Sequence, residues 1–393
     1  MRVSVGVDVG KADHWVCAIG PDGAVLLDRR VANRPGDLAE AMAALAGLGG
    51  PVRAGLDVLG GVGGLVFGML SAAGFTVAHV PGLAVNRARE ASVGGENKSD
   101  PRDARAIAEQ VRVRSDLRQI EPRTEVDLEI GLMARRRAEL TQAQTQRLSR
   151  LGDLICSIFP GLEQALDLRL KGSLHLLARY VTPEEIRAAG ARGLRRHMGR
   201  AGGAVRAAAM IDKVLEAANA QTIQLPGERP TARLVRELAA EALAARQRLG
   251  EIDKELEGLV DRHPDGALVR SLPGMGAVLA ASFIAHAGPL TRFRSADALA
   301  AAAGLAPVLR QSGKSRRLRR ANGGHRQLKH ALFLGAFCAI QRDPISRAFY
   351  QRKRSEGKTH TQAIVALARR RINVLWAMLH SRTLYQPPLA LAS

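Results

Sequence analysis

Apolar residues occupy every second position at the start of the chain. The valines from Val3 to Val9 alternate with Ser4, Gly6, Asp8 and Gly10. This two-residue period gives a β-strand one apolar face. Two more strand-like runs follow at 14–19 and 25–27, separated by the turn residues Pro21-Asp22-Gly23. The start of the chain therefore predicts a three-stranded meander.

Helices and strands alternate in the next stretch. Residues 37–48 are rich in Ala and Leu and predict a helix, and residues 52–56 predict a short apolar strand that runs into Asp57. Helix and strand repeat at 64–73 and 75–80, with Gly or Pro at each break. The order β-β-β-α-β-α-β-α predicts a mixed sheet with helices on both faces, which is an α/β domain of the ribonuclease-H type.

Four acids lie at positions that this topology would bring together at one edge of the sheet. Asp8 lies at the end of the first strand and Asp57 at the end of the fourth, and Asp100 and Asp103 lie three residues apart. With Asp100 as N-cap and Pro101 as the first helical residue, Asp103 projects from the first turn on nearly the same side. Carboxylates that gather in a partly dry site repel one another, and divalent metal ions relieve the repulsion. These acids therefore predict a site for two Mg²⁺ ions, for which Mn²⁺ can substitute, and phosphoryl-transfer chemistry.

Local sequence leaves other roles open for two of these acids. Asp100 as a plain helix cap and Asp57 as a turn residue after a strand fit equally well. Asp8 is harder to explain structurally, because a buried charge costs several kcal/mol unless it is paired or bound to metal.

The charge balance indicates the partner. The 393 residues contain 58 Lys and Arg against 37 Asp and Glu, a net charge of +21, which favours a nucleic acid partner. A membrane surface is disfavoured, because the basic residues do not adjoin a hydrophobic anchor and no apolar run could span a bilayer. The N-terminus does not resemble a signal peptide, so a cytoplasmic protein is expected. Three scattered cysteines predict reduced, buried thiols and neither a zinc site nor a disulfide framework.

Long helices follow from about residue 125. Residues 126–159 contain few helix breakers, and the apolar residues from Val235 to Leu259 keep a heptad repeat. The two helices are expected to pair as an antiparallel hairpin or across a subunit contact. Shorter helices at about 161–230 read as an inserted bundle.

A mostly helical unit begins near residue 266. Ser271 to Ala281 resembles the hairpin of a helix-hairpin-helix motif, in which Gly274 and Gly276 would let backbone N–H groups approach a phosphate. A plain helix N-terminus after a Pro-Gly turn is the alternative. The last long helix, 361–379, is expected to carry Arg369, Arg370 and Arg371 on its solvent side.

One stretch of this unit contains a serine close in sequence to several Lys and Arg residues. Residues 304–320 read as a loop that holds Ser312, a candidate nucleophile for a phosphate, with Ser315 as its rival. An ordinary basic loop fits the same stretch. The candidate nucleic-acid contacts here are Arg310, Lys314, Arg316, Arg317, Arg319 and Arg320, and Lys98 is another beside the acids.

Seven segments together resemble a known family. They are Asp8 in Gly-Val-Asp-Val-Gly-Lys, Asp57, the box Lys98-Ser99-Asp100-Pro101-Arg102-Asp103-Ala104, Leu272-Pro273-Gly274-Met275-Gly276, Gly304-Leu305-Ala306-Pro307, Gln311-Ser312-Gly313 and Ala366-Leu367-Ala368-Arg369. In this order they resemble the DEDD-type transposases of the insertion sequence 110 family, which includes Piv-type DNA invertases and bridge-RNA-guided recombinases.

The resemblance implies a fold and a site. Residues 1–120 would form a RuvC-like domain whose acids Asp8, Asp57, Asp100 and Asp103 bind Mg²⁺. Residues 121–265 would form coiled-coil helices with the inserted bundle, and 266–393 a transposase domain with Ser312 as nucleophile. The family usually has Glu as its second acid, so Asp57 departs from the pattern.

The resemblance also implies partners. Similar proteins act on donor and target DNA, guided by a structured bridge RNA. They are homodimers that assemble into tetramers, in which the acids of one subunit meet the serine of another.

The sequence therefore predicts a transposase that forms a phosphoserine link to DNA. A hydrolytic nuclease or junction resolvase would use the same acids with water as nucleophile. A non-catalytic DNA-binding protein would need only the basic surface.

Overall fold

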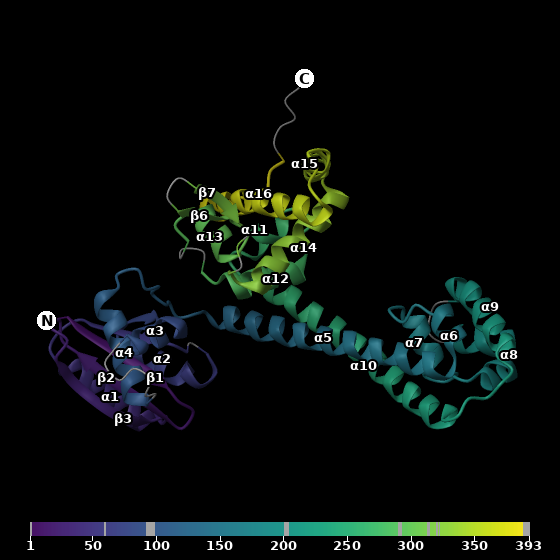
Figure 1. Cartoon of the computed structure of the whole chain (residues 1–393), viewed down its shortest axis with the longest axis horizontal. Coiled ribbons are helices and arrows are strands. Elements are labelled where there is room, and N and C mark those ends of the chain that lie inside the picture. Colours follow the sequence, from purple (N-terminus) through teal and green to yellow (C-terminus); the bar gives the residue numbers. More distant parts are fainter. Residues whose placement is uncertain are drawn as a thin grey trace, which may run out of the picture. The chain divides into compact units, whose positions relative to one another are not determined.

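A computed structural model describes residues 2–58, 60–91, 99–199, 204–289, 293–312, 315–319, 321 and 323–387. At 204–207, 310, 312 and 318 it describes the backbone and not the side chain. The chain forms two compact units, Met1–Arg123 and Thr124–Ser393 (Figure 1). The three-part division expected from the sequence stays a prediction.

The first unit is built on one mixed sheet of five strands. The strands are β1 (Val3–Val9), β2 (Asp13–Ile19), β3 (Val25–Ala32), β4 (Val52–Leu56) and β5 (Thr76–His79), in the order β3-β2-β1-β4-β5. The first three form the antiparallel meander, and β1, β4 and β5 run parallel. The mixed α/β sheet predicted from the sequence is confirmed, and it fits a ribonuclease-H-like domain.

Helices cover both faces of the sheet. The odd-numbered valines of β1 pack with α1 (Pro35–Ala46) and with α2 (Gly64–Ala72), which follows the short helix η1 (Gly61–Gly63). The opposite face carries α4 (Asp100–Val113), which packs beside α3 (Gly82–Glu90). Successive residues of the first strand therefore face, in turn, the helical layer on one side of the sheet and the helical layer on the other.

Two glycines let α4 lie directly on the sheet. Gly6 of β1 and Gly55 of β4 are register partners. A Cβ on Gly6 would lie 2.0 Å from the carbonyl oxygen of Ala104, and one on Gly55 would lie 2.9 Å from the Ile107 side chain. Only glycine permits this approach.

Two long helices open the second unit. They are α5 (Glu125–Ile158) and α10 (Glu228–Arg262). Arg137 pairs with Asp253 at 2.5 Å, and Arg147 pairs with Glu241 at 3.1 Å. Later residues of α5 meet earlier residues of α10, so the helices pack antiparallel, as one of the two sequence alternatives predicted.

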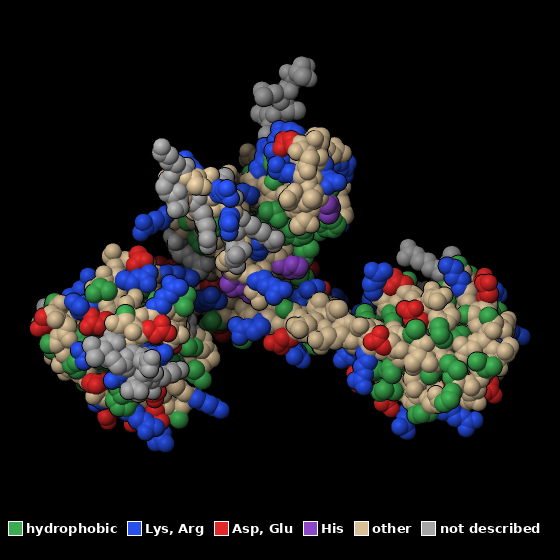
Figure 2. All heavy atoms as spheres, viewed as in Figure 1, with side chains coloured by type: hydrophobic (Ala, Val, Ile, Leu, Met, Phe, Trp, Pro, Cys, Tyr) green, Lys and Arg blue, Asp and Glu red, His purple; other side chains and the backbone are tan. Residues whose placement is uncertain are grey.

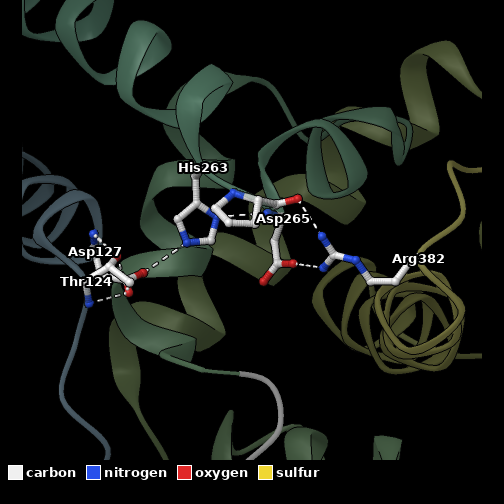
Figure 3. A network of polar contacts seen from close by, with 6 residues as sticks. Thr124, Asp127, His263, Asp265 and Arg382 are labelled. Carbon is white, nitrogen blue, oxygen red and sulfur yellow. Dashed lines mark hydrogen bonds and ion pairs between the residues drawn. The ribbon is translucent and has the colours of Figure 1, made fainter.

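A polar network joins the ends of several helices in this unit (Figure 3). Thr124 and Asp127 form a capping box at the start of α5. His263, just after α10, donates from Nε2 to Asp127 at 3.0 Å and accepts at Nδ1 from the Asp265 N–H at 3.0 Å. Arg382, at the end of α16 (His360–Ser381), pairs with Asp265. The network therefore anchors α5, α10 and α16 to one another.

The chain between α5 and α10 forms four shorter helices, which pack around a separate core. They are α6 (Pro160–Ala165), α7 (Lys171–Leu177), α8 (Pro183–Gly199) and α9 (Ala204–Ala220). Their apolar residues pack with Ile155 of α5 and Val235 of α10. This matches the position expected for an inserted bundle.

The remaining helices pack around another core of the second unit. They are α11 (Gly266–Ser271), α12 (Ala277–Ala287), α13 (Ala296–Ala302), α14 (Arg326–Arg342), α15 (Pro344–Ser355) and α16. Ile130 of α5 and Leu256 of α10 belong to the same core.

Three expectations for side chains and local structure are wrong. The stretch around Ser312 is a β-hairpin of β6 (Val308–Ser312) and β7 (Ser315–Arg319), where a loop was expected. Arg371, expected on the solvent side of its helix, is buried, and its guanidinium donates to the carbonyl of Pro273. Cys156 is exposed on α5. Among the described residues, no helix is both long and apolar enough to cross a membrane.

Candidate active site

Two of the predicted acids end neighbouring parallel strands. Asp8 is the next-to-last residue of β1, and Asp57 directly follows β4. Val7 is the register partner of Leu56, so the acids that follow them lie next to each other at the carboxyl edge. Asp8 is two residues from Gly6 and therefore shares its face of the sheet, the face covered by α4.

Helix α4 brings a third acid to this edge. It runs antiparallel to β1 and β4, because the carbonyls of Val111 and Arg114, at its C-terminal end, accept hydrogen bonds from Arg53 near the start of β4. Its N-terminal turn therefore lies at the carboxyl ends of the strands. Asp103, in that turn, is buried, whereas Asp100 is exposed.

The start of α4 differs from the sequence interpretation in one respect. Ser99 is the N-cap, and Asp100 is the first helical residue, followed by Pro101. Asp100 is therefore not the N-cap, and the side chain of Ser99 makes no capping hydrogen bond.

Asp57 is electrostatically frustrated. Its Oδ1 atom is buried and has no hydrogen-bond partner. Burial raises the pKa of Asp57, and the nearby charge of Asp103 raises it further, against hydrogen bonds from backbone N–H groups that lower it. A buried oxygen that repels a neighbouring carboxylate is a position where a cation would be stabilised.

Two residues at this edge were missed from the sequence. Arg89, near the end of α3, donates to Asp103 Oδ1 at 2.8 Å, and both side chains are nearly buried. His79, the last residue of β5, lies with Nε2 3.3 Å from the backbone oxygen of Asp57. His79 carried the same signal that identified Asp57, a polar residue at the end of an apolar strand. Arg89 carried none, because its helix is rich in arginine.

The carboxyl edge fits a metal ion by its chemistry. Carboxylate oxygens are the ligands that Mg²⁺ prefers, and the unpartnered oxygen of Asp57 is available for one. Within the described ranges, however, no three His, Cys, Asp or Glu side chains are arranged to hold a metal ion. Arg89 occupies one oxygen of Asp103, and Asp100 points to solvent, so binding would require side-chain rearrangement.

The serine hairpin belongs to the second unit. Ser312 ends β6 and pairs in register with Ser315, so both candidate nucleophiles lie at the same end of the hairpin. Arg316, Arg317 and Arg319 are exposed on β7. Of the other predicted contacts, Lys98, Lys314, Arg320 and the side chain of Arg310 lie outside the described residues.

Glycines fix the base of this hairpin. Gly304 and Gly324 both have positive φ, at 64° and 102°. A Cβ on Gly324 would lie 2.4 Å from the backbone nitrogen of Gly304. The segment that enters the hairpin and the segment that leaves it are therefore in direct backbone contact. Lys329 donates to the Gly304 carbonyl at 2.9 Å.

The two glycines of the hairpin-like turn lie in different surroundings. Gly274 has φ +81°, and a Cβ there would lie 2.4 Å from the Gly335 carbonyl oxygen, so this glycine packs against α14. Gly276 is the N-cap of α12, and a Cβ there would meet open space. The open helix N-terminus at Gly276 is therefore the part of the turn accessible to a phosphate.

Comparison with known proteins gives the family. A DEDD transposase family model for IS110 elements matches residues 5–160, and the model described as "Transposase IS116/IS110/IS902 family" matches 266–351. The insertion element IS900 uncharacterized 42 kDa protein of Mycobacterium paratuberculosis is 40% identical over 100% of this chain and 99% of its own length. The chain belongs to the IS110 family of transposases.

Two further relatives extend the comparison. The IS116 uncharacterized 44.8 kDa protein of Streptomyces clavuligerus is 38% identical over 98% of this chain and 96% of its own. The pilin gene-inverting protein of Moraxella bovis is 30% identical over 136 residues, which are 33% of this chain and 42% of that protein. This IS110-family transposase is thus related to a site-specific recombinase, and DEDD transposases are generally metal-dependent.

Proposed function

We propose that this transposase cuts and rejoins DNA through a covalent bond between Ser312 and a DNA phosphate. The observation that carries the proposal is the carboxyl edge, where the fold of a DEDD transposase gathers Asp8, Asp57 and Asp103. The hairpin supports it, because its backbone register pairs Ser312 with Ser315, which directly precedes exposed Arg316 and Arg317.

The acids would hold the metal ions. Asp8, Asp57 and Asp103, with Asp100 after a change of rotamer, would provide the oxygen ligands for Mg²⁺ or Mn²⁺. Bound metal ions would neutralise charge on the reacting phosphate. Asp57 has a shorter side chain than the family's usual Glu, so it reaches less far than a glutamate at this position would.

Ser312 would hold the cut DNA strand through a covalent bond. The Ser312 hydroxyl loses its proton as its oxygen attacks phosphorus. The bond from phosphorus to the leaving strand's oxygen breaks, and that oxygen takes up a proton, so the step releases no net proton. A hydroxyl of the incoming strand then attacks the phosphoserine, which restores the serine hydroxyl. The energy of the phosphodiester bond is kept throughout, so no ATP is needed. Exposed Arg316, Arg317 and Arg319 would bind phosphates near this linkage, together with Arg310, Lys314, Arg320 and Lys98.

The partners follow from the family. We propose that donor and target DNA are selected by a structured bridge RNA and that dimers assemble into tetramers. The acids of one subunit then act with Ser312 of another. The division into a RuvC-like domain, coiled-coil helices and a transposase domain belongs to the same proposal.

Trapping the covalent link tests this function. We expect the purified protein, given its co-purifying RNA, paired DNA sites and Mg²⁺, to yield a protein–DNA adduct that withstands denaturation. Ser312→Ala should abolish the adduct, and Ser315→Ala, its neighbour across the hairpin, should retain it. Cleavage that continues in Ser312→Ala, with no adduct in the wild type, would favour the nuclease with water as nucleophile.

A further inference from the structure

Helices α15 and α16 contain a segment with a strong excess of positive charge. Between Pro344 and Arg371 the chain has eight Lys and Arg and one acid, Glu356. Figure 2 shows blue side chains on the surface around α15. An excess of like charge costs stability through repulsion.

Three of the eight cations bind groups outside α15 and α16. Arg347 donates to the carbonyls of Ile340 and Gln341 at the end of α14. Arg369 pairs with Asp297 of α13. Arg371 is buried against Pro273, and burial lowers its pKa to about 10.

The other five form a surface that we call the α15–α16 patch. Its members are Arg352, Lys353, Arg354, Lys358 and Arg370. Glu356 is the acid within it and lies 2.7 Å from Lys353, 3.8 Å from Lys358 and 3.9 Å from Arg352. One carboxylate shared among these cations leaves the patch strongly positive.

An aromatic ring orders three of these cations. The Phe349 ring centroid lies 5.1 Å from the guanidinium carbon of Arg352, 5.0 Å from that of Arg370 and 5.6 Å from Lys353 Nζ. Cation–π attraction holds each charge near the ring and does not itself use the N–H groups of the cation. Cations in the last turn also stabilise the end of a helix, but that role does not explain Arg370, which comes from the other helix.

We infer that the α15–α16 patch binds the phosphate backbone of duplex DNA outside the sites of strand exchange. The charge is complementary to phosphates, and the ordered guanidinium groups reduce the entropy lost on binding. Phe349 is surrounded by cations, so it is not a free platform for stacking an unpaired base, which single-stranded and structured RNA sites use. The inference requires that the transposase act on DNA and does not depend on Ser312 as nucleophile.

Salt-dependent binding of a duplex by the full-length protein tests the patch. In Arg352→Gln/Arg354→Gln/Arg370→Gln, the slope of log affinity against log salt concentration should fall by about 2.7, since each phosphate contact contributes about 0.9. The matched control is Arg136→Gln/Arg248→Gln/Arg262→Gln, which removes the same charge from arginines that already face acids on α5 and α10. The control should change the slope by less than about 1.

A second variant tests the ordering by the ring. Phe349→Leu keeps every charge, so we expect an unchanged salt slope and a several-fold weaker affinity. Equal slopes for the two triple variants, or an unchanged affinity for Phe349→Leu, would overturn the inference. So would loss of structured-RNA binding with duplex binding intact. Adduct formation at Ser312, measured with saturating DNA, separates this outcome from failure of the proposed function.

Discussion

At the scale of single residues, the proposed metal-binding role of Asp57 conflicts with the stability of the metal-free protein. An oxygen without a hydrogen bond and a repelling neighbour, Asp103, are unfavourable in a protein without metal. Arg89 relieves the charge of Asp103, and no described hydrogen bond reaches Oδ1 of Asp57. Such frustration is expected where a cation or substrate completes the site.

Asp57→Asn should therefore stabilise the metal-free protein. In EDTA we expect the unfolding temperature of the first unit to rise by about 2 °C, because the substitution removes a charge that Asp103 repels. The same variant should lose the stabilisation that Mg²⁺ gives the wild type. Scanning calorimetry with and without Mg²⁺ measures both effects.

Glu40→Gln provides the control for charge. It removes one negative charge from an exposed position on α1, and it should leave both the unfolding temperature and the Mg²⁺ response unchanged. If Asp57→Asn is less stable than the wild type in EDTA, the frustration assigned to this carboxylate is wrong.

Residue identities at the site were only partly predictable. Asp8 and Asp57 follow apolar strands, and this position signals a sheet edge in any α/β sequence. Arg89 acquires its role only because α3 packs beside α4, which is a tertiary contact. Arg371 was misassigned for the same reason, since the sequence does not reveal that Pro273 and Ser346 surround its guanidinium.

At the scale of elements, the contact between α4 and the sheet sets the position of the acids. Gly6 and Gly55 remove the side chains that would separate helix from strand, so Asp103 reaches the level of Asp8 and Asp57. The elements of this unit were predictable because apolar alternation and Gly or Pro breaks mark each one. The hairpin of Ser312 was missed because its strands are rich in Arg, Gln and Ser, without apolar alternation.

Gly6→Ala should separate α4 from β1. A Cβ there would lie 2.0 Å from a carbonyl oxygen, so we expect a loss of about 3 kcal/mol in the free energy of unfolding and loss of DNA cleavage. Gly68→Ala is the matched control, because a Cβ on this α2 glycine would meet nothing within 4 Å. The control should be neutral or more stable by up to about 1 kcal/mol. Chemical denaturation compares them, and equal stability of the two variants would contradict the close-packing account.

The network of Figure 3 predicts a response to acid. Burial alone would raise the pKa of Asp127, but hydrogen bonds from Thr124 and His263 outweigh it and lower the pKa. An acid with a lowered folded-state pKa contributes stability above its ordinary pKa of about 3.9, and this stability is lost as pH falls through the folded value.

Asp127→Asn should therefore be less stable than the wild type at neutral pH and should lose less stability below about pH 4. Thermal unfolding of the second unit from pH 7 to pH 3 measures the two curves. Asp153→Asn, at an exposed position of α5, should follow the wild type throughout. Parallel curves for Asp127→Asn and the wild type would show that this carboxylate does not anchor the helices.

At the scale of the whole molecule, the residues of the proposed chemistry are divided between two units. Met1–Arg123 supplies the carboxylates, and Thr124–Ser393 supplies Ser312 and most of the basic surface. The sequence predicted both sets of residues and the family. It does not give the geometry of the proposed reaction, in which the acids and Ser312 come from different copies of the chain.

The most direct measurement is mass spectrometry of the trapped protein–DNA adduct in wild type and acid variants. With RNA, paired sites and Mg²⁺, we expect wild-type protein to carry DNA on the peptide that contains Ser312. Asp8→Asn and Asp103→Asn should carry none, although each still binds duplex DNA. An adduct on Ser312 of undiminished yield in either acid variant would show that the carboxylates and the serine do not act on the same phosphate.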